Sequence, residues 1–136
     1  MPDLLQAYAE VVGPAVIEQL RQLALLLQHL KFVHVNSTRL GGGVAEILEK
    51  HVPLMNELGI DTRWEIITGN AEFYAEFYQC TEALQNGLQG EPVHLPSEWL
   101  ANFETVGVAN ADRLRPALEE ADLVFIHDPQ PAPLLR

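Results

Sequence analysis

Three consecutive glycines, at positions 41–43, constrain this chain more than any other feature of its sequence. An apolar run at residues 32–35 precedes them and changes to polar side chains at 36–38, while residues 44–48 have helical spacing. Glycine tolerates positive φ and lets a ligand approach the backbone, and the start of a helix has free N–H groups. Strand, glycine loop and helix in this order fit two interpretations: a site for an anion or a sugar, and a plain tight turn. Neither the dinucleotide fingerprint nor the P-loop spacing is present.

Strand patterns alternate with helix patterns along the rest of the chain. The predicted strands are 31–36, 61–67 and 121–128, and the predicted helices are 3–12, 14–29, 43–58, 71–88, 98–110 (capped by Ser97) and 111–120. This alternation predicts an α/β fold, a Rossmann-like parallel sheet with helices flanking both faces. We divide the chain into an N-terminal helical extension, 1–30, and a partial Rossmann-like domain, 31–136.

Polar residues follow each predicted strand, at 36–43, 68–70 and 127–130. Ligands of parallel sheets bind beyond the carboxyl ends of the strands, so we expect these segments to face one crevice. Asp128 at such an end fits two roles, a carboxylate that binds sugar hydroxyls and a cap for neighbouring loop amides. Gln130, held between two prolines, fits a hydroxyl ligand or the closure of a turn.

The predicted sheet has only three strands, and the last of them lies close to the end of the given sequence. A parallel sheet that stopped there would expose the free edge of an apolar strand. The sequence therefore indicates an incomplete domain. We expect the exposed edge to cause self-association into a homo-oligomer.

Charge and composition exclude several classes of function. The formal charge is −11, and the eight Lys and Arg residues form no basic stripe, which argues against nucleic-acid and membrane partners. The lone cysteine, the lack of a signal-peptide pattern and the shortness of every apolar run predict a cytoplasmic protein. No His, Cys and carboxylate spacing suggests a metal site, so we expect no metal and no cofactor.

Four single residues have the simpler interpretation of core positions. His34 lies inside a strand and His51 on the apolar face of a helix, where histidines are more often packed than catalytic. Trp64 is expected in the core rather than as a platform for a sugar ring. Cys80 is expected to be an inert core thiol.

Several segments together resemble one family. These are YAEVVG at 8–13, VHVNST at 33–38, GGGVAE at 41–46, RWE at 63–65 and VFIHDPQP at 124–131. They are similar to the trehalose glycosyltransferring synthases, retaining enzymes of the GT-B fold in glycosyltransferase family 4, close to the trehalose phosphorylases. The similarity spans nearly the whole chain, in order.

The resemblance implies the N-terminal half of a GT-B glycosyltransferase, which joins glucose from a nucleotide-diphosphate glucose to a second glucose. It implies an acceptor-binding role for Asp128, and the expected substrate-binding residues are Ser37, Gly42, Gly43, Asp128 and Gln130. The donor-binding half is absent from the sequence, and no catalytic residue is assigned. We expect weak binding of glucose or trehalose, donor binding only with a C-terminal domain, and no turnover. The alternatives are a non-catalytic oligomerising or partner-binding module and, among enzymes, a trehalose phosphorylase.

Overall fold

A computed structural model describes residues 4–69 and 71–135 of the chain. Its sheet contains β1 (Lys31–Asn36), β2 (Asp61–Ile66) and β3 (Leu123–Ile126), in the order β2-β1-β3. Both pairings with the central strand are parallel. The predicted parallel α/β sheet is therefore confirmed.

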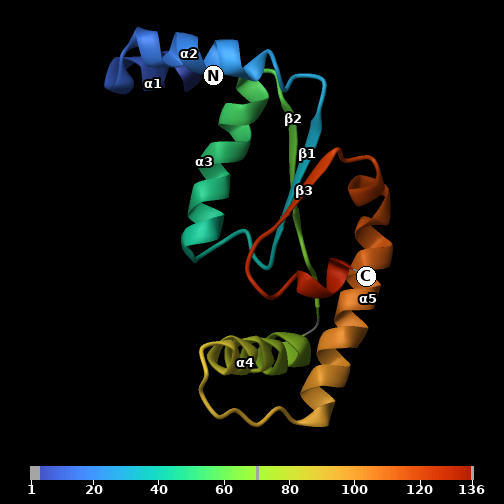
Figure 1. The fold of residues 1–136 in the computed structure, drawn as a ribbon. Coiled ribbons are helices and arrows are strands. Elements are labelled where there is room, and N and C mark those ends of the chain that lie inside the picture. The colour runs from blue at the N-terminus through green and yellow to red at the C-terminus, as the bar shows by residue number, and fades with distance from the viewer. Residues whose placement is uncertain (1–3, 70, 136) are drawn as a thin grey trace.

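Helices lie on both sides of the sheet and at its two ends (Figure 1). They are α1 (Leu4–Val12), α2 (Pro14–Ala24), α3 (Gly43–Glu57), α4 (Ala71–Leu88), α5 (Ser97–Glu119) and the 3-10 helix η1 (Ala132–Leu135). Helices α3 and α5 lie on opposite sides of the strands, α1 and α2 near the amino ends, and α4 beyond the carboxyl ends (Figure 1). The crossovers thus leave the carboxyl ends of the strands between α3, α4 and the segment after β3.

Several predicted boundaries are wrong, among them those of the third strand, which spans Leu123–Ile126 instead of 121–128. Residues 98–110 and 111–120 form one helix, because Asn110 stays helical and its Nδ2 donates to the Val106 and Thr68 carbonyls. Ser97 is the first residue of α5 rather than its cap, and no side chain caps this end in the described part of the chain. The second helix ends at Ala24 instead of residue 29. Beyond its C-cap residue the backbone hydrogen bonds join residues three positions apart, as in a 3-10 helix, instead of four.

Two apolar clusters hold the elements together. One cluster lies between the sheet, α5 and η1, and its buried residues are Val33, Val35, Ile67, Leu114 and Leu134. The other joins α1 and α2 to the amino ends of the strands and consists of Leu5, Ile17, Ala24, Phe32, Leu58 and Ile60. Glu57 of α3 also accepts hydrogen bonds from the backbone N–H groups of Leu4 and Leu5. The N-terminal helices therefore pack directly on the α/β part.

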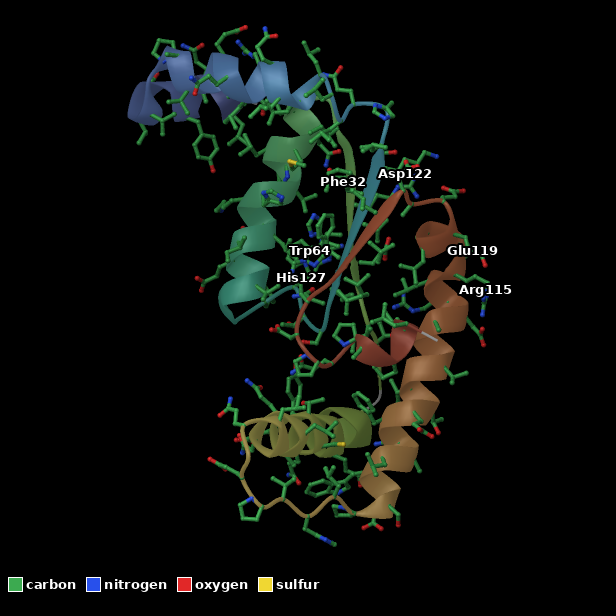
Figure 2. The ribbon with its side chains drawn as sticks, viewed as in Figure 1. Phe32, Trp64, Arg115, Glu119, Asp122 and His127 are labelled. Carbon is green, nitrogen blue, oxygen red and sulfur yellow. The ribbon has the colours of Figure 1, made fainter. Side chains whose placement is uncertain are left out.

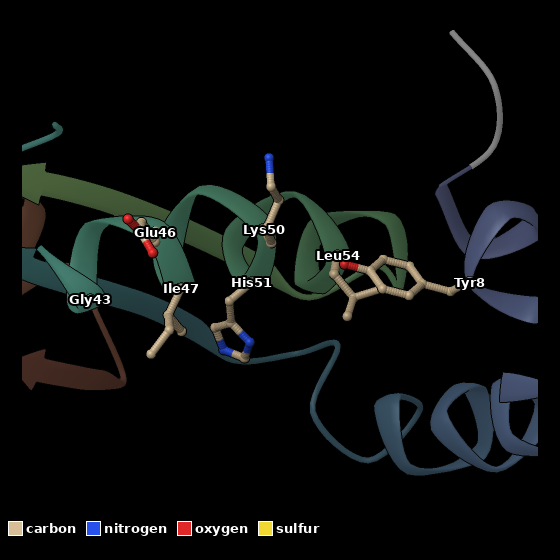
Figure 3. Close-up of a pocket in the computed structure, with 7 residues that line it drawn as sticks. All are labelled: Tyr8, Gly43, Glu46, Ile47, Lys50, His51 and Leu54. Atoms are coloured by element: carbon tan, nitrogen blue, oxygen red, sulfur yellow. The ribbon is translucent and has the colours of Figure 1, made fainter. Parts of the chain in front are cut away.

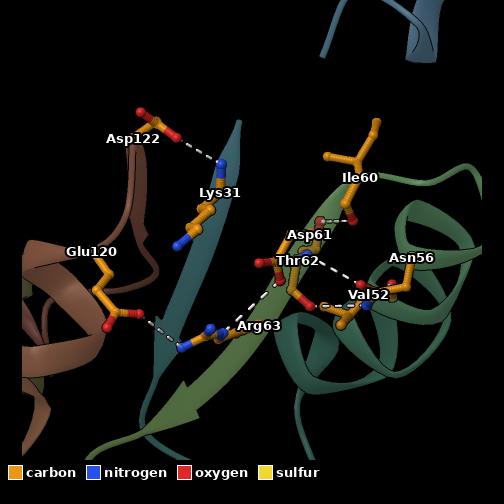
Figure 4. Close-up of polar contacts among 9 residues, drawn as sticks. All are labelled: Lys31, Val52, Asn56, Ile60, Asp61, Thr62, Arg63, Glu120 and Asp122. Atoms are coloured by element: carbon orange, nitrogen blue, oxygen red, sulfur yellow. Dashed lines mark hydrogen bonds and ion pairs between the residues drawn. The ribbon is translucent and has the colours of Figure 1, made fainter. Parts of the chain in front are cut away.

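Polar contacts fix the amino ends of the strands (Figure 4). The Asp122 carboxylate accepts a hydrogen bond of 2.8 Å from the Lys31 backbone N–H, and the Asn56 side chain bonds both backbone groups of Thr62. Asp122 marks this end of β3, whereas His127 lies at the opposite, carboxyl end (Figure 2). The amino ends are thus occupied by structural contacts, which leaves the carboxyl ends for a ligand.

Candidate functional site

A cavity of about 390 Å³ lies at the carboxyl ends of the strands, a volume typical of small-molecule sites. It is lined by Asn36, Ser37, Thr38, Gly41, Gly42, Gly43, Val44, Ala45, Tyr78, Asp128 and Gln130. All five residues predicted from the sequence are among them, although positions 43 and 128 are 85 residues apart. The structure therefore brings these five residues into one crevice, and their role in binding stays a prediction. Thr68 and Gly69, which were also expected there, are not among the residues that line this cavity, and position 70 lies outside the described residues.

The glycine loop forms one wall of this cavity. Gly41 has φ of +75° and Gly42 of +85°, values that other residues rarely adopt. A Cβ atom added at Gly41, Gly42 or Gly43 would meet nothing within 4 Å, so the loop faces open space. Gly42 precedes α3, and no side chain within the described residues caps that helix. The first N–H groups of α3 are consequently available to a ligand.

Asp128 lines the cavity from the segment that follows β3. The His127 backbone N–H donates to the Val35 carbonyl at 2.9 Å, and the chain then turns at Asp128. Asp128 has φ of +65°, and it is the one non-glycine residue in the described ranges with positive φ. Aspartate tolerates this conformation better than most residues, and such outliers cluster at functional sites. The turn leaves the carboxylate exposed beside the cavity.

Gln130 contributes an acceptor that has no partner among the described residues. Its Oε1 is buried and makes no hydrogen bond to any described residue. Buried polar atoms in proteins are nearly always hydrogen-bonded, so an orphaned acceptor needs an explanation. Its position in the cavity fits a ligand that donates a hydrogen bond, such as a hydroxyl group.

Six lining residues were not among the predicted site residues, and Asn36 and Tyr78 are two of them. Tyr78 reaches the cavity from α4, and its hydroxyl lies 3.5 Å from the Oγ of Ser37. Asn36 is 2% exposed and accepts a 2.7 Å hydrogen bond from Nε1 of Trp64. Asn36 could have been predicted from the sequence, because it is a polar residue directly after an apolar run. The sequence holds no comparable signal for Tyr78, because α4 joins the site through tertiary packing.

Three histidines lie close together, at His34, His51 and His127. The Nδ1 of His34 and the Nε2 of His127 are 2.9 Å apart, and the His34 ring also meets His51 with 5.5 Å between ring centroids. Burial, together with the charges of His127 and His51, lowers the pKa of His34 to about 4. Burial also lowers the pKa of His127, while the charge of Asp128 opposes this shift. His34 is therefore neutral at pH 7, inside the sheet as predicted.

A second, more open cavity of about 600 Å³ runs along α3 (Figure 3). It is lined by Tyr8, Gly43, Glu46, Ile47, Lys50, His51 and Leu54. His51, predicted as a core residue, is only half-buried, and Ile47 is 65% exposed. This cavity shares Gly43 with the first one but contains no other predicted site residue. It is a groove beside a helix rather than a cluster of convergent polar groups.

Metal clusters, membrane-spanning helices and the single cysteine were also considered among the described residues. They contain no group of three or more His, Cys, Asp or Glu side chains placed to hold a metal ion. None of their helices is long and apolar enough to cross a membrane. Cys80 is fully buried, and burial raises the pKa of its thiol, as expected for an unreactive core cysteine.

Comparison with known proteins gives a consistent match. Residues 34–136 match the family described as "Trehalose synthase, N-terminal domain". The trehalose synthases of Thermococcus litoralis and Pyrococcus furiosus are each 42% identical over 132 residues, covering 96% of this chain and 31% of theirs. The trehalose synthase of Pyrococcus horikoshii is 39% identical over 132 residues, covering 96% and 30%. The chain thus spans about 30% of the length of these relatives.

Proposed function

This chain belongs to the trehalose synthase N-terminal domain family, and we propose that it forms the acceptor side of a retaining glucosyltransferase. The proposed reaction joins glucose from a nucleotide-diphosphate glucose to a second glucose, which gives trehalose. The observation that carries this proposal is the cavity in which the glycine loop, Asp128 and the orphaned acceptor of Gln130 meet.

The proposed acceptor contacts follow from the chemistry of the lining. A carboxylate accepts strong hydrogen bonds from sugar hydroxyls, which assigns the main contact to Asp128. The Oε1 of Gln130 is a second acceptor, and the hydroxyls of Ser37 and Tyr78 both donate and accept. Several such contacts hold the attacking hydroxyl in one orientation, which is a positioning contribution to catalysis.

The glycine loop has a different proposed role. Negative charge grows on the departing phosphate of the donor, and backbone N–H groups aimed at it would stabilise that charge. Gly42 and Gly43 are the proposed sources, since they stand at the open start of α3. Donor binding is proposed to need the C-terminal domain. By itself this chain should bind glucose or trehalose weakly and should not turn over.

The test is a calorimetric titration of the 136-residue chain with glucose and with trehalose. We expect millimolar binding, which corresponds to about −4 kcal/mol. Asp128→Asn keeps a residue that tolerates positive φ but removes the charge, so affinity should fall by roughly 10- to 100-fold. Asp112→Asn, at an exposed position on α5, is the matched control and should bind like the unsubstituted chain. Equal affinity in both variants would contradict the acceptor role of Asp128.

A second candidate function, a non-catalytic oligomerising module, is favoured by the surface of β3. This strand is at one edge of the described sheet, and its side chains at Leu123, Val124 and Phe125 are 45%, 38% and 39% exposed. An exposed apolar edge strand is a template for pairing with another chain. We propose a second copy of this chain as its partner.

A further inference from the structure

We propose that Arg39 and Trp64 clamp the glycine loop against β2, so that Arg39 is a positioning residue for the cavity. The identity of the ligand rests on the proposed function, but the clamp itself is a property of the free chain. Neither residue is among those that line the cavity.

The clamp has two contacts on the Arg39 side. The guanidinium carbon of Arg39 lies 4.6 Å from the centroid of the Trp64 ring, a cation–π distance. The Nη2 of the same guanidinium donates a 2.6 Å hydrogen bond to the Trp64 carbonyl oxygen. A planar group that stacks and donates at once suits arginine and not lysine. Arg39, which precedes the glycines, therefore contacts β2 at a residue 25 positions further along the chain.

On its other side, Trp64 is joined to the cavity. Its indole Nε1 donates a 2.7 Å hydrogen bond to the Oδ1 of Asn36, which is 2% exposed and lines the cavity. The Asn36 carbonyl in turn accepts from the Ile67 N–H at 3.0 Å. Trp64 therefore connects the start of the loop with the buried end of β1, and a disturbance at Arg39 has a direct route to the cavity wall.

The loop needs such a tie because its own residues contribute little to holding it. Glycine loses more conformational freedom on ordering than other residues, and Gly41 and Gly42 both adopt positive φ. Leu40 is 86% exposed and adds almost no packing. Thr38 bonds with the backbone of Leu40, but that contact is internal to the loop. Arg39 connects the loop to the rest of the fold.

The first measurement needs no ligand. We would compare ¹⁵N relaxation of Gly41, Gly42 and Gly43 in the unsubstituted chain and in Arg39→Ala. The variant should lower the order parameters from the range of rigid backbone, about 0.85, toward the flexible range below about 0.6. Arg115→Ala, at an exposed arginine of α5, is the matched control and should leave the loop unchanged. Unchanged loop order in Arg39→Ala would overturn the proposal.

The second measurement uses Trp64 as a reporter. The sequence has two tryptophans, so Trp99→Phe isolates the emission of Trp64. Loss of the stacked guanidinium in Arg39→Ala should raise acrylamide quenching of Trp64, whereas Arg39→Lys should be intermediate. Quenching equal to that of the parent chain would show that the stacking does not exist in solution and would also overturn the proposal.

The third measurement connects the clamp to binding. Titration with trehalose should give an affinity about tenfold weaker in Arg39→Ala, with an unchanged unfolding midpoint of the sheet. Full affinity together with a loosened loop would overturn the positioning role. If the unsubstituted chain binds neither glucose nor trehalose, the proposed function fails, and the relaxation measurement still decides whether the clamp exists.

Discussion

Acid should destabilise this fold through His34 in a way that can be isolated from other groups. The side chain is 4% exposed, lies among His51, His127 and Phe125, and has a pKa lowered to about 4 from 6.5. Burial is the largest cause, and the two neighbouring histidines add to it. The folded state therefore favours the neutral imidazole.

The sign and size of the effect follow from proton linkage. Above pH 6.5 the imidazole is neutral in both states and costs nothing. As the pH falls from 6.5 toward 4, the imidazole binds a proton in the unfolded chain but stays neutral in the folded chain. The free energy of unfolding therefore decreases by about 1.4 kcal/mol per pH unit. The loss from this one group should reach about 2 kcal/mol at pH 5 and about 3 kcal/mol at pH 4.

Urea unfolding between pH 7 and pH 4, followed by circular dichroism, measures this loss. His34→Gln removes the titrating group and keeps a side chain able to bond with His127. It should start less stable at pH 7 and lose about 2 kcal/mol less than the parent chain by pH 5. His29→Gln, at an exposed position after α2, is the control and should follow the parent. Parallel pH profiles for His34→Gln and the parent would refute the reasoning.

Three further predictions concern packing, assembly and activity. A Cβ at Gly107 would clash with the Cβ of Pro133, so Gly107→Ala should cost about 1–3 kcal/mol in urea unfolding. A gain of stability, as helix propensity alone predicts, would contradict the observed contact of η1 with α5. Self-association through β3 should appear in sedimentation velocity as a concentration-dependent oligomer that Val124→Lys weakens, and a clean monomer at high concentration would contradict it. The purified chain should form no trehalose from nucleotide-diphosphate glucose and glucose, and any measurable product would show that the essential donor groups are already present.

The sequence was sufficient to predict those elements whose structure is decided by neighbouring residues. The apolar run of β1, the glycines after it and the spacing of α3 are all short-range signals, and each element formed where predicted. The meeting of the glycine loop with Asp128 needed one general rule, that parallel strands present their carboxyl ends at the same edge. That rule brought the residues after β1 and β3 to one cavity, but Thr68 and Gly69 after β2, which it also placed there, do not line it.

Where tertiary contacts decide, the sequence was insufficient. The continuity of α5 depends on Asn110. Its side chain forms hydrogen bonds with Thr68, which lies outside the helix, as well as with Val106 inside it. Tyr78 enters the cavity through the placement of α4, which no periodicity reveals. Trp64 was assigned to the core because aromatic strand residues are usually buried. Its ring is only half-buried: Arg39 stacks on it, and its Nε1 donates a hydrogen bond to Asn36.

The most direct test of the proposed acceptor site is to locate glucose on the chain by ¹H–¹⁵N chemical-shift mapping. Glucose at concentrations up to several times a millimolar dissociation constant should shift the amide signals of Gly42, Gly43 and Asp128 together, on one saturating curve. Shifts confined to the groove along α3, at Ile47 and His51, or no saturable shift at all, would contradict the account.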